Sequence, residues 1–437
     1  MPSTETIRNI QNLIWLYFWL LIVEGLLRKW VIPQLSTPLL IIRDPVVIAA
    51  YFLAFKAGIF PKDMFTKSII YIAFISLLGS LATVIISDTS LTVTLYGLRT
   101  NFLHLPLIFL ISKVFCLNDV KKLGRWVLLL SVPMAVLMIY QFNAPPDAFI
   151  NRGASAESQQ ISSALGKIRP AGTFSFITGA AQYFSLLTSF LLYGLVQSKI
   201  YPNWLLSAAG LSLVLALAVS GSRTAIWSVV LVLISLLAVL LIRPSLAKKS
   251  YKFMLVAGII SLSLSLMPSF NEGIEVLNTR FENANASEAA GGGIVGRFFS
   301  GFLEPFNNVN KIPLLGYGLG MGTNVGAALL TQKAQFIEGE WERVVFESGL
   351  FLGLLYILLR IALLGLMGVL CIKSASTSNI LPLLLFGSCL ILILIGQFGQ
   401  PTSLGFAVLE GGLCLASLQF ESYKQALPAT YENFINR

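Results

Sequence analysis

The chain has 437 residues, of which 56% are hydrophobic and only 11% are charged, and its formal net charge is +10. Soluble domains carry about 25% charged residues, so this composition excludes the soluble class. Apolar runs long enough to cross a bilayer as helices recur along the chain and predict an all-α, polytopic membrane protein. Four cysteines without CxxC spacing and a single histidine, His104, argue against a disulfide framework and a metal centre. We therefore expect no metal and no cofactor.

The apolar runs, taken in chain order between their polar breaks, predict about twelve transmembrane helices. They lie near 10–27, 39–55, 68–86, 91–115, 126–142, 180–197, 204–220, 224–242, 253–267, 346–372, 380–398 and 403–419. No signal-peptide cleavage site follows the first run, which we interpret as a retained span. The chain shows no internal repeat, and we treat residues 1–437 as a single integral membrane domain.

The charges of the short connections predict the orientation in the membrane. One alternating set carries thirteen Lys and Arg, and the other carries three, Arg28, Lys29 and Arg223. Cytoplasmic connections hold the excess of Lys and Arg, so the first set and both termini are predicted to be cytoplasmic. The positive net charge is thus explained by membrane topology, and because no basic run is interleaved with aromatic residues we expect no nucleic-acid partner.

Two long segments, 143–179 and 268–345, interrupt this pattern, and both are predicted to lie outside the cytoplasm. A structureless loop of 78 residues would be unusual. "EGIEVLNTRFENANA" and "IVGRFFSGFLEPFNNV" have helical spacing. The larger segment is therefore expected to form short amphipathic helices at the outer membrane face, separated by the flexible "AAGGG" at 289–293.

Arginine predominates among the cations outside the cytoplasmic set. Topogenic charge can be Lys or Arg, whereas a planar fork that binds phosphate through two hydrogen bonds must be Arg. The arginines predicted to converge at the outer interface, where a lipid diphosphate headgroup would lie, are Arg169, Arg223, Arg297 and Arg343. Arg99 lies inside an apolar run, where a charge is costly and often marks function, although a structural role is an equal alternative.

Other buried charges have structural interpretations. Arg28 follows Glu24 by four residues, which favours a pair on one helix. Arg43 precedes Asp44 and is expected to form an internal ion pair. Arg360 is expected to pair internally or to extend toward the membrane surface, and His104 to be a buried hydrogen-bonding side chain.

Acidic residues stand at the start of the tenth apolar run, in "FIEGEWERVVFESGLFLGLLY" (336–356). Glu340, Arg343 and Glu347 are spaced by three and four residues and can share one helix face. Arg343 is the natural partner of Glu347, which leaves Glu340 as the candidate carboxylate that accepts a proton. The alternative is a solvated helix start in which acids interact with the dipole. The glycines of "LLGYGLGMGTN" (314–324) lack the GxGxxG spacing and instead suggest a tight loop packed near the membrane or a sugar.

The order of several motifs resembles the O-antigen ligase and O-antigen polymerase superfamily. They are "RPAGTFSFITGAAQYFSLL" (169–187), "SGSRTAI" (220–226), "GRFFSGFLEPF" followed by "PLLGYGLGMGTN" (296–324), and "EWERVVFESGLFLG" (340–353). The resemblance covers roughly residues 165–360. It implies a GT-C-like, multi-spanning glycosyltransferase of the bacterial inner membrane that uses a glycan on undecaprenyl diphosphate at the periplasmic face, with the lipid bilayer, an acceptor glycan and polysaccharide export components as partners.

The resemblance also implies roles for particular residues. Arg169 and Arg223 match arginines that bind the donor diphosphate, Arg297 matches the loop arginine, and Glu347 with Gly349 matches the "ExG" that opens the next helix. Ligases of this family carry a histidine upstream of "ExG", whereas this chain has Glu338 and Glu340 in that region. We therefore expect a metal-independent polysaccharide polymerase. The alternatives are an O-antigen ligase or protein O-oligosaccharyltransferase and, in another class, an anion or lipid-linked sugar transporter.

Overall fold

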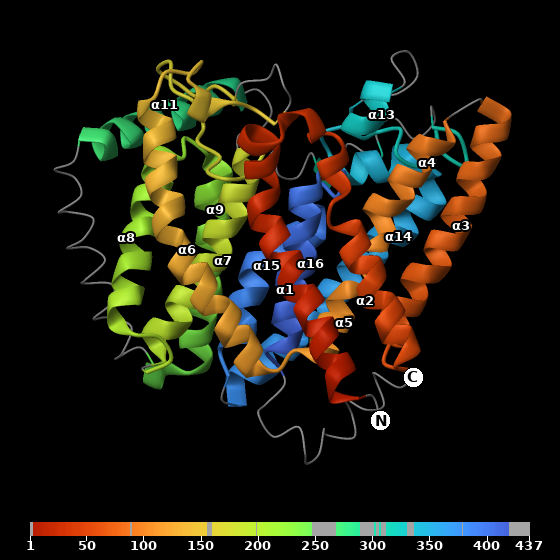
Figure 1. Ribbon diagram of the computed structural model, residues 1–437, viewed down its shortest axis with the longest axis horizontal. Helices are drawn as coiled ribbons and strands as arrows, with labels where there is room; N and C mark the ends of the chain where they lie inside the picture. The colour runs from red at the N-terminus through yellow and green to blue at the C-terminus, as the bar shows by residue number, and fades with distance from the viewer. Residues whose placement is uncertain are drawn as a thin grey trace.

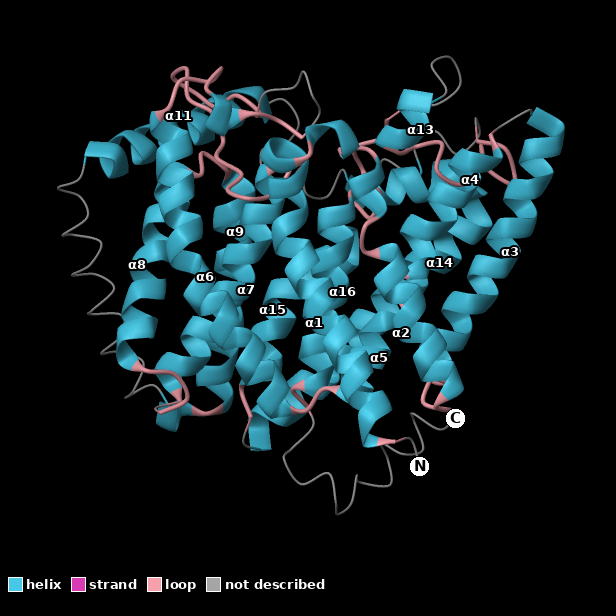
Figure 2. Ribbon diagram, viewed as in Figure 1, coloured by secondary structure: helices cyan, strands magenta, loops and turns pink. Residues whose placement is uncertain are grey.

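A computed structural model shows the chain as a bundle of helices joined by loops (Figure 2). The residues that it describes are 3–87, 90–154, 160–197, 199–246, 268–288, 301–302, 306, 312–329, 336–377 and 379–418. Within these ranges there is no β-strand, and the only strand-like pairing is an isolated bridge between Ser162 and Ile168. The expectation of an all-α protein is confirmed for this part of the chain.

The helices lie side by side, and neighbours in space are often distant in the chain, as α16 and α1 are (Figure 1). The first half contributes α1 (Thr4–Leu26), η1 (Leu27–Val31), η2 (Pro33–Leu35), η3 (Pro38–Ile41), α2 (Asp44–Lys56), α3 (Met64–Ser87), α4 (Leu91–Leu98), η4 (Arg99–Leu103), α5 (Leu107–Val114), α6 (Leu117–Asn143) and η5 (Phe149–Asn151). The second half contributes α7 (Ile177–Val196), α8 (Asn203–Val219), α9 (Arg223–Ile242), η6 (Pro244–Leu246), α11 (Pro268–Glu288), α13 (Asn324–Leu329), α14 (Glu340–Thr377), α15 (Leu381–Ile395) and α16 (Pro401–Ala416).

Seven helical segments of the described chain are long and apolar enough to cross a membrane. They are Thr4–Val31, Pro38–Lys56, Met64–Ile86, Leu117–Asn143, Ile177–Val196, Arg223–Ile242 and Glu340–Thr377. Three further expected spans are shorter apolar helices, α8, α15 and α16. The span expected at 91–115 is interrupted, and the one expected at 253–267 lies outside the described residues. The structure is therefore that of a helical, multi-pass membrane protein, while the total of twelve spans stays a prediction.

The interruption between α4 and α5 has a local cause. Pro106 has no backbone N–H, so it cannot continue the helical hydrogen-bond ladder, and the chain passes through the π-helical turn η4 before it. A second π-helical turn, η1, ends the first span and carries Arg28 and Lys29. Such turns widen a helix locally and recur at functional sites. Here both turns carry buried charged residues into the bundle.

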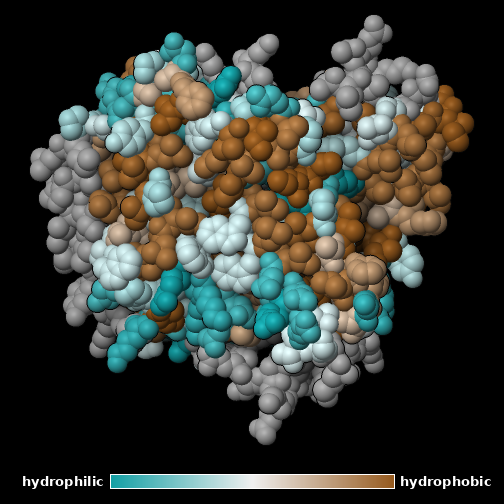
Figure 3. All heavy atoms as spheres, viewed as in Figure 1, coloured by the Kyte–Doolittle hydropathy of each residue, from teal (hydrophilic) through white to brown (hydrophobic). Residues whose placement is uncertain are grey.

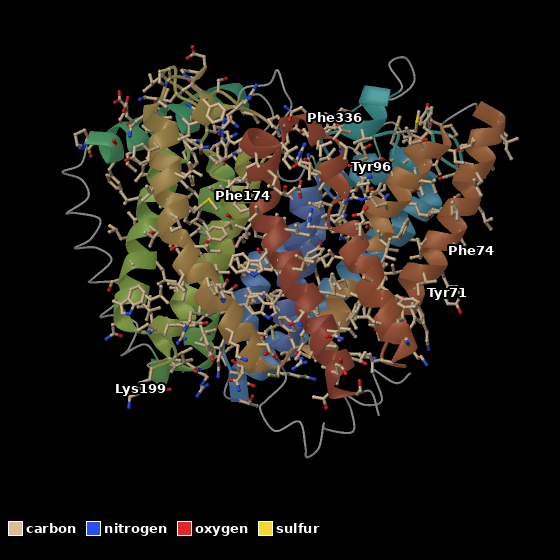
Figure 4. The ribbon with its side chains drawn as sticks, in the orientation of Figure 1. Tyr71, Phe74, Tyr96, Phe174, Lys199 and Phe336 are labelled. Atoms are coloured by element: carbon tan, nitrogen blue, oxygen red, sulfur yellow. The ribbon has the colours of Figure 1, made fainter. Side chains whose placement is uncertain are left out.

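The centre of the bundle is α7, whose residues are almost all buried. It packs against α6, α8, α9, α15 and α16, and α16 in turn packs against α5 and α15 (Figure 1). Helix α3 lies at the edge of the bundle, with exposed apolar side chains that include Tyr71 and Phe74 (Figure 4). A broad hydrophobic band covers much of the face shown in Figure 3, as expected for a surface in contact with lipid.

The two ends of the bundle differ in structure. Residues 144–154 and 160–176, α11 and α13 gather at the upper end in Figure 1. Lys199 lies at the lower end, and Phe336 at the upper end (Figure 4). The helix expected in "EGIEVLNTRFENANA" is confirmed in α11, whereas the "AAGGG" stretch and most of "IVGRFFSGFLEPFNNV" lie outside the described residues, and α13 was not expected from the sequence. Both long segments therefore border the same end, away from Lys199.

Helix α14 bends at Gly349, where a glycine-rich loop docks against it. Gly349 has φ of +77°, and a Cβ there would collide with the backbone of Leu314. The loop is held by backbone hydrogen bonds from Tyr317 N to Phe346 O (2.9 Å) and from Gly318 N to Glu347 O (3.0 Å). The glycines of "LLGYGLGMGTN" thus serve close backbone packing, as a tight loop requires.

We expect Gly349→Ala to destabilise the protein by about 3 kcal/mol, because alanine adds both left-handed backbone strain and a steric clash. Thermal unfolding of the purified protein in detergent, followed by size exclusion, measures the loss. Gly365→Ala is the matched control on the same helix, since a Cβ there meets no atom within 4 Å. Equal melting temperatures for Gly349→Ala and Gly365→Ala would contradict this account of the loop.

Candidate functional site

Two of the arginines expected at the outer interface, Arg169 and Arg223, are electrostatic neighbours, and a third, Arg280, joins them. Arg169 lies in the segment before α7, Arg223 begins α9, and Arg280 lies on α11. Burial, and then the positive charges of Arg280 and Arg223, lower the pKa of the Arg169 guanidinium. We call these three residues the arginine cluster. It concentrates positive charge where the long segments meet the helices.

One face of α11 brings Arg280 to this position. Glu272, Val276 and Arg280 are spaced by four residues and therefore lie along one side of the helix. Glu272 Oε1 is 2.8 Å from Lys167 Nζ, and buried Val276 faces Gly221, which lies two residues before Arg223. Helix α11 is thus docked on both chain segments that supply the other two arginines.

A cavity of about 190 Å³ lies beside the arginine cluster and is partly lined by Arg169. Its other polar lining side chains are Arg28, Gln160 and Ser175, and none of the described residues that line it is acidic. Phe176, which is 44% exposed, and Ile161, which is 45% exposed, add an apolar rim. We call this space the upper cavity. Cations, hydrogen-bond donors and an exposed apolar rim suit a ligand with an anionic head and an apolar tail.

Several polar atoms around the upper cavity have no hydrogen-bond partner among the described residues. Two of these buried atoms, Gln160 Nε2 and Arg169 Nε, belong to residues that line the cavity, and two more, Ser163 Oγ and Thr178 Oγ1, lie on the adjoining chain segments. Buried polar groups are nearly always hydrogen-bonded, so such a set calls for water or a ligand that is not a protein group. The amide and guanidinium nitrogens can only donate, which favours a ligand rich in acceptor oxygens.

The backbone around the upper cavity is fixed by the first and sixth helices. Gly172, with φ of +60°, donates its N–H to Gln141 Oε1 (2.8 Å). Its carbonyl accepts from Lys29 Nζ (2.6 Å) and from Gln141 Nε2 (3.2 Å). Phe174, two residues on, is buried against aromatic rings of α7 and α16 (Figure 4). The "RPAGTFS" stretch is therefore a rigid support for Arg169 and Ser175.

The acidic residues at the start of α14 belong to a different set, which we call the buried ion network: Glu340, Arg343, Glu347 and Arg360, with Asn101. Glu340 accepts hydrogen bonds from Arg343 Nε and NH2 (both 3.0 Å) and from Arg360 NH1 (2.7 Å). Its side chain is fully buried. The expectation that Glu340 is free to accept a proton is therefore wrong. The helix is broken at Gly349, so the part before the break packs against the part after it and Arg360, twenty residues on, meets the Glu340 carboxylate.

The rest of the buried ion network is equally saturated. Arg343 NH1 is 2.7 Å from Glu347 Oε2, which confirms the expected pair, and Arg343 NH2 donates to Asn101 Oδ1 (2.7 Å). Glu347 Oε1 also accepts from the N–H of Gly322 in the glycine-rich loop (3.1 Å). Arg343 is thus occupied by protein groups and does not join the arginine cluster.

Arg99 is also paired, through a contact that sequence spacing does not indicate. Its Nε lies 2.5 Å from Asp44 Oδ2, and Asp44 Oδ1 lies 3.0 Å from His104 Nε2. His104 Nδ1 is in turn 3.0 Å from the hydroxyl of Tyr17. Asp44 therefore binds Arg99 rather than its chain neighbour Arg43, and the structural interpretation of Arg99 and of His104 is favoured.

The remaining expected residues lie as follows. Arg28 NH1 is 3.4 Å from Glu24 Oε1, the expected helix pair, although Arg28 also lines the upper cavity. Arg43 NH2 is 3.4 Å from Glu24 Oε2. Glu338 is exposed. Arg297 lies outside the described residues.

The chain matches no protein-family model, no curated protein and no solved structure.

Sequence reasoning missed two residues of the upper cavity, Arg28 and Gln160, and one residue of the arginine cluster, Arg280. Arg280 had a usable signal, because Glu272, Val276 and Arg280 recur every four residues in a segment already expected to be helical. Arg28 was expected only to form a pair with Glu24 on the same helix. Gln160 carried no signal, since a lone glutamine in a polar loop has no distinctive pattern.

We expect Glu340→Gln to destabilise the fold by about 3–5 kcal/mol, because it leaves Arg343 and Arg360 buried with one carboxylate between them. The melting temperature and yield of the purified membrane protein measure this loss. Glu338→Gln changes an exposed carboxylate two residues away and serves as the control. A normal melting temperature for Glu340→Gln together with lost activity would instead support the proton-acceptor role expected from the sequence.

Proposed function

We propose that the protein is a membrane glycosyltransferase that transfers a glycan from polyprenyl diphosphate to a sugar hydroxyl, acting as a polysaccharide polymerase. The observation that carries this proposal is the arginine cluster beside the upper cavity, where the charges that act on Arg169 are positive. A diphosphate offers negative charge and acceptor oxygens to this site, where none of the described residues that line the cavity is acidic. The order of the sequence motifs around Arg169 and Arg223 supports the same assignment.

The chemistry would be displacement at the anomeric carbon of the lipid-linked sugar. The oxygen of the acceptor hydroxyl forms the new C–O bond while the bond to the diphosphate breaks, and the electron pair leaves with the diphosphate. Arg169 and Arg223 would stabilise the charge that grows on this leaving group. The hydroxyl proton passes to a base or to water. Glu340 already accepts hydrogen bonds from two arginines, so we do not assign it the role of this base.

The environment of the site also suits a lipid-linked donor. The upper cavity is bordered by the exposed apolar side chains Phe176 and Ile161, so an isoprenoid chain could leave it toward the bilayer. The lysine-rich connections, of which Lys199 is one, border the other end of the bundle (Figure 4). With those connections in the cytoplasm, the upper cavity would face the periplasm of a bacterial inner membrane.

A transporter is the second candidate, because several charged residues are buried within the helix bundle. Charged residues are buried in the bundle at two π-helical turns: Arg99 of η4 pairs with Asp44, and Arg28 of η1 contacts Glu24, which also contacts Arg43. Transporters often build substrate sites from interrupted helices near the middle of the membrane. In this alternative the buried charges, rather than the arginine cluster, would contact the substrate.

We expect Arg223→Ala to lower polymer formation on the order of a hundredfold, because one charge-stabilising group of the transition state is removed. A deletion strain complemented with each variant is analysed for cell-surface polysaccharide and for glycan on the lipid carrier. Arg125→Ala, at an exposed position near the start of α6, is the control.

Single repeat units on the carrier in the Arg223→Ala strain would support a polymerase, and full-length unattached chains would indicate a ligase. Normal polysaccharide with Arg223→Ala and with Arg169→Ala would contradict both enzyme assignments. Loss of polysaccharide only in variants of Asp44 and Glu24, with the protein still folded, would favour transport.

A further inference from the structure

Arg28, at the end of the first span, lines the upper cavity. It stands in the π-helical turn η1 and is held from several directions. Its Nε donates to the carbonyl of Ser36 (2.9 Å), and its NH1 donates to Ser175 Oγ (2.9 Å). Its side chain is therefore oriented by partners on two other chain segments.

The charge of Arg28 is only weakly compensated. Its contact with Glu24 is long, at 3.4 Å, and Glu24 is shared with Arg43 at the same distance. The second terminal nitrogen, NH2, makes no hydrogen bond to a described residue, while Nε and NH1 are used by the protein. An arginine that is fixed through two of its nitrogens and has the third available is well suited to bind an anion in the cavity.

We propose that Arg28 is a second phosphate-binding residue of the site, which acts together with Arg169 on one diphosphate. This inference rests on the proposed function. The two guanidinium groups come from different elements, η1 and the segment before α7, and line the same cavity. A ligand with two phosphates can bind both guanidinium groups, one phosphate to each. A ligand with one phosphate can bind only one of the two guanidinium groups fully. Arg28 would thus help the site to prefer a lipid diphosphate to a lipid monophosphate.

The neighbouring cation does not share this role. The amine of Lys29 donates to the carbonyl of Gly172 at 2.6 Å and lies 4.4 Å from the centre of the Trp30 ring. Lys29 therefore holds the backbone that carries Arg169 and does not line the cavity. The adjacent residues Arg28 and Lys29 divide two tasks, ligand binding and support of the loop.

The test is binding of farnesyl diphosphate and farnesyl monophosphate to the purified full-length protein in detergent. The wild type is expected to bind the diphosphate more tightly. Arg28→Lys removes the planar fork and is expected to weaken diphosphate binding by about tenfold to a hundredfold, with a smaller effect on the monophosphate. The ratio of the two affinities therefore falls. Arg360→Lys, a buried arginine of the separate ion network, is the matched control and is expected to keep the ratio.

Glu24→Gln provides a variant with an effect of the opposite sign. It keeps the shape of the side chain and removes the negative charge next to Arg28, so diphosphate affinity per folded protein is expected to rise. Because Glu24 also contacts buried Arg43, the folded fraction is measured by melting temperature and size exclusion before the affinities are compared. A purely structural role of Arg28 predicts no gain in affinity from this change. If Arg28→Lys does not fold, the result with Glu24→Gln decides the proposal.

The outcomes separate this inference from the proposed function. An unchanged affinity ratio in Arg28→Lys, with weaker binding of both ligands in Arg169→Lys, would overturn the role of Arg28 and leave the proposed function standing. Unchanged diphosphate binding in both Arg169→Lys and Arg223→Lys would overturn the proposed function itself. Equal affinity for inorganic pyrophosphate and farnesyl diphosphate would assign the site to a free anion and contradict a lipid-linked donor.

Discussion

A charge buried inside a membrane protein must be compensated by an opposite charge or by hydrogen bonds, and this constraint separates the arginines of the chain into two groups. Arg343 and Arg360 are held by Glu340 and Glu347, and Arg99 is held by Asp44. Arg169 instead has two cations, Arg223 and Arg280, as its electrostatic neighbours. The first group stabilises the fold, and the second lies where the proposed function places the diphosphate.

The compensated charges also connect the site to the interior of the bundle. Arg28 contacts Glu24, Glu24 contacts Arg43, and Arg43 NH1 lies 3.4 Å from the hydroxyl of Tyr17. From Tyr17 the contacts continue through His104 and Asp44 to Arg99. These interactions tie α1, α2 and the η4 turn together, so the wall of the upper cavity that carries Arg28 rests on a set of buried polar contacts.

Composition and short-range spacing predicted the helical membrane fold and the helix-surface contacts. The pairs of Arg28 with Glu24 and of Arg343 with Glu347 follow from a spacing of four residues, because those positions lie on one helix face. The pair of Arg99 with Asp44 joins residues 55 positions apart, and the contact of Arg360 with Glu340 joins residues on either side of the helix break at Gly349. Such pairings depend on how helices pack and bend, which residue spacing does not encode. For the same reason, Glu340 looked free in the sequence.

The central claim is that the diphosphate binds between Arg169, Arg28 and the rest of the arginine cluster. Cryo-electron microscopy of the protein in lipid nanodiscs with undecaprenyl diphosphate tests it most directly. The account predicts density for two phosphates in the upper cavity, within hydrogen-bond distance of Arg169 and Arg28. Density for the headgroup beside Arg343 or Arg99, with an empty upper cavity, would contradict it.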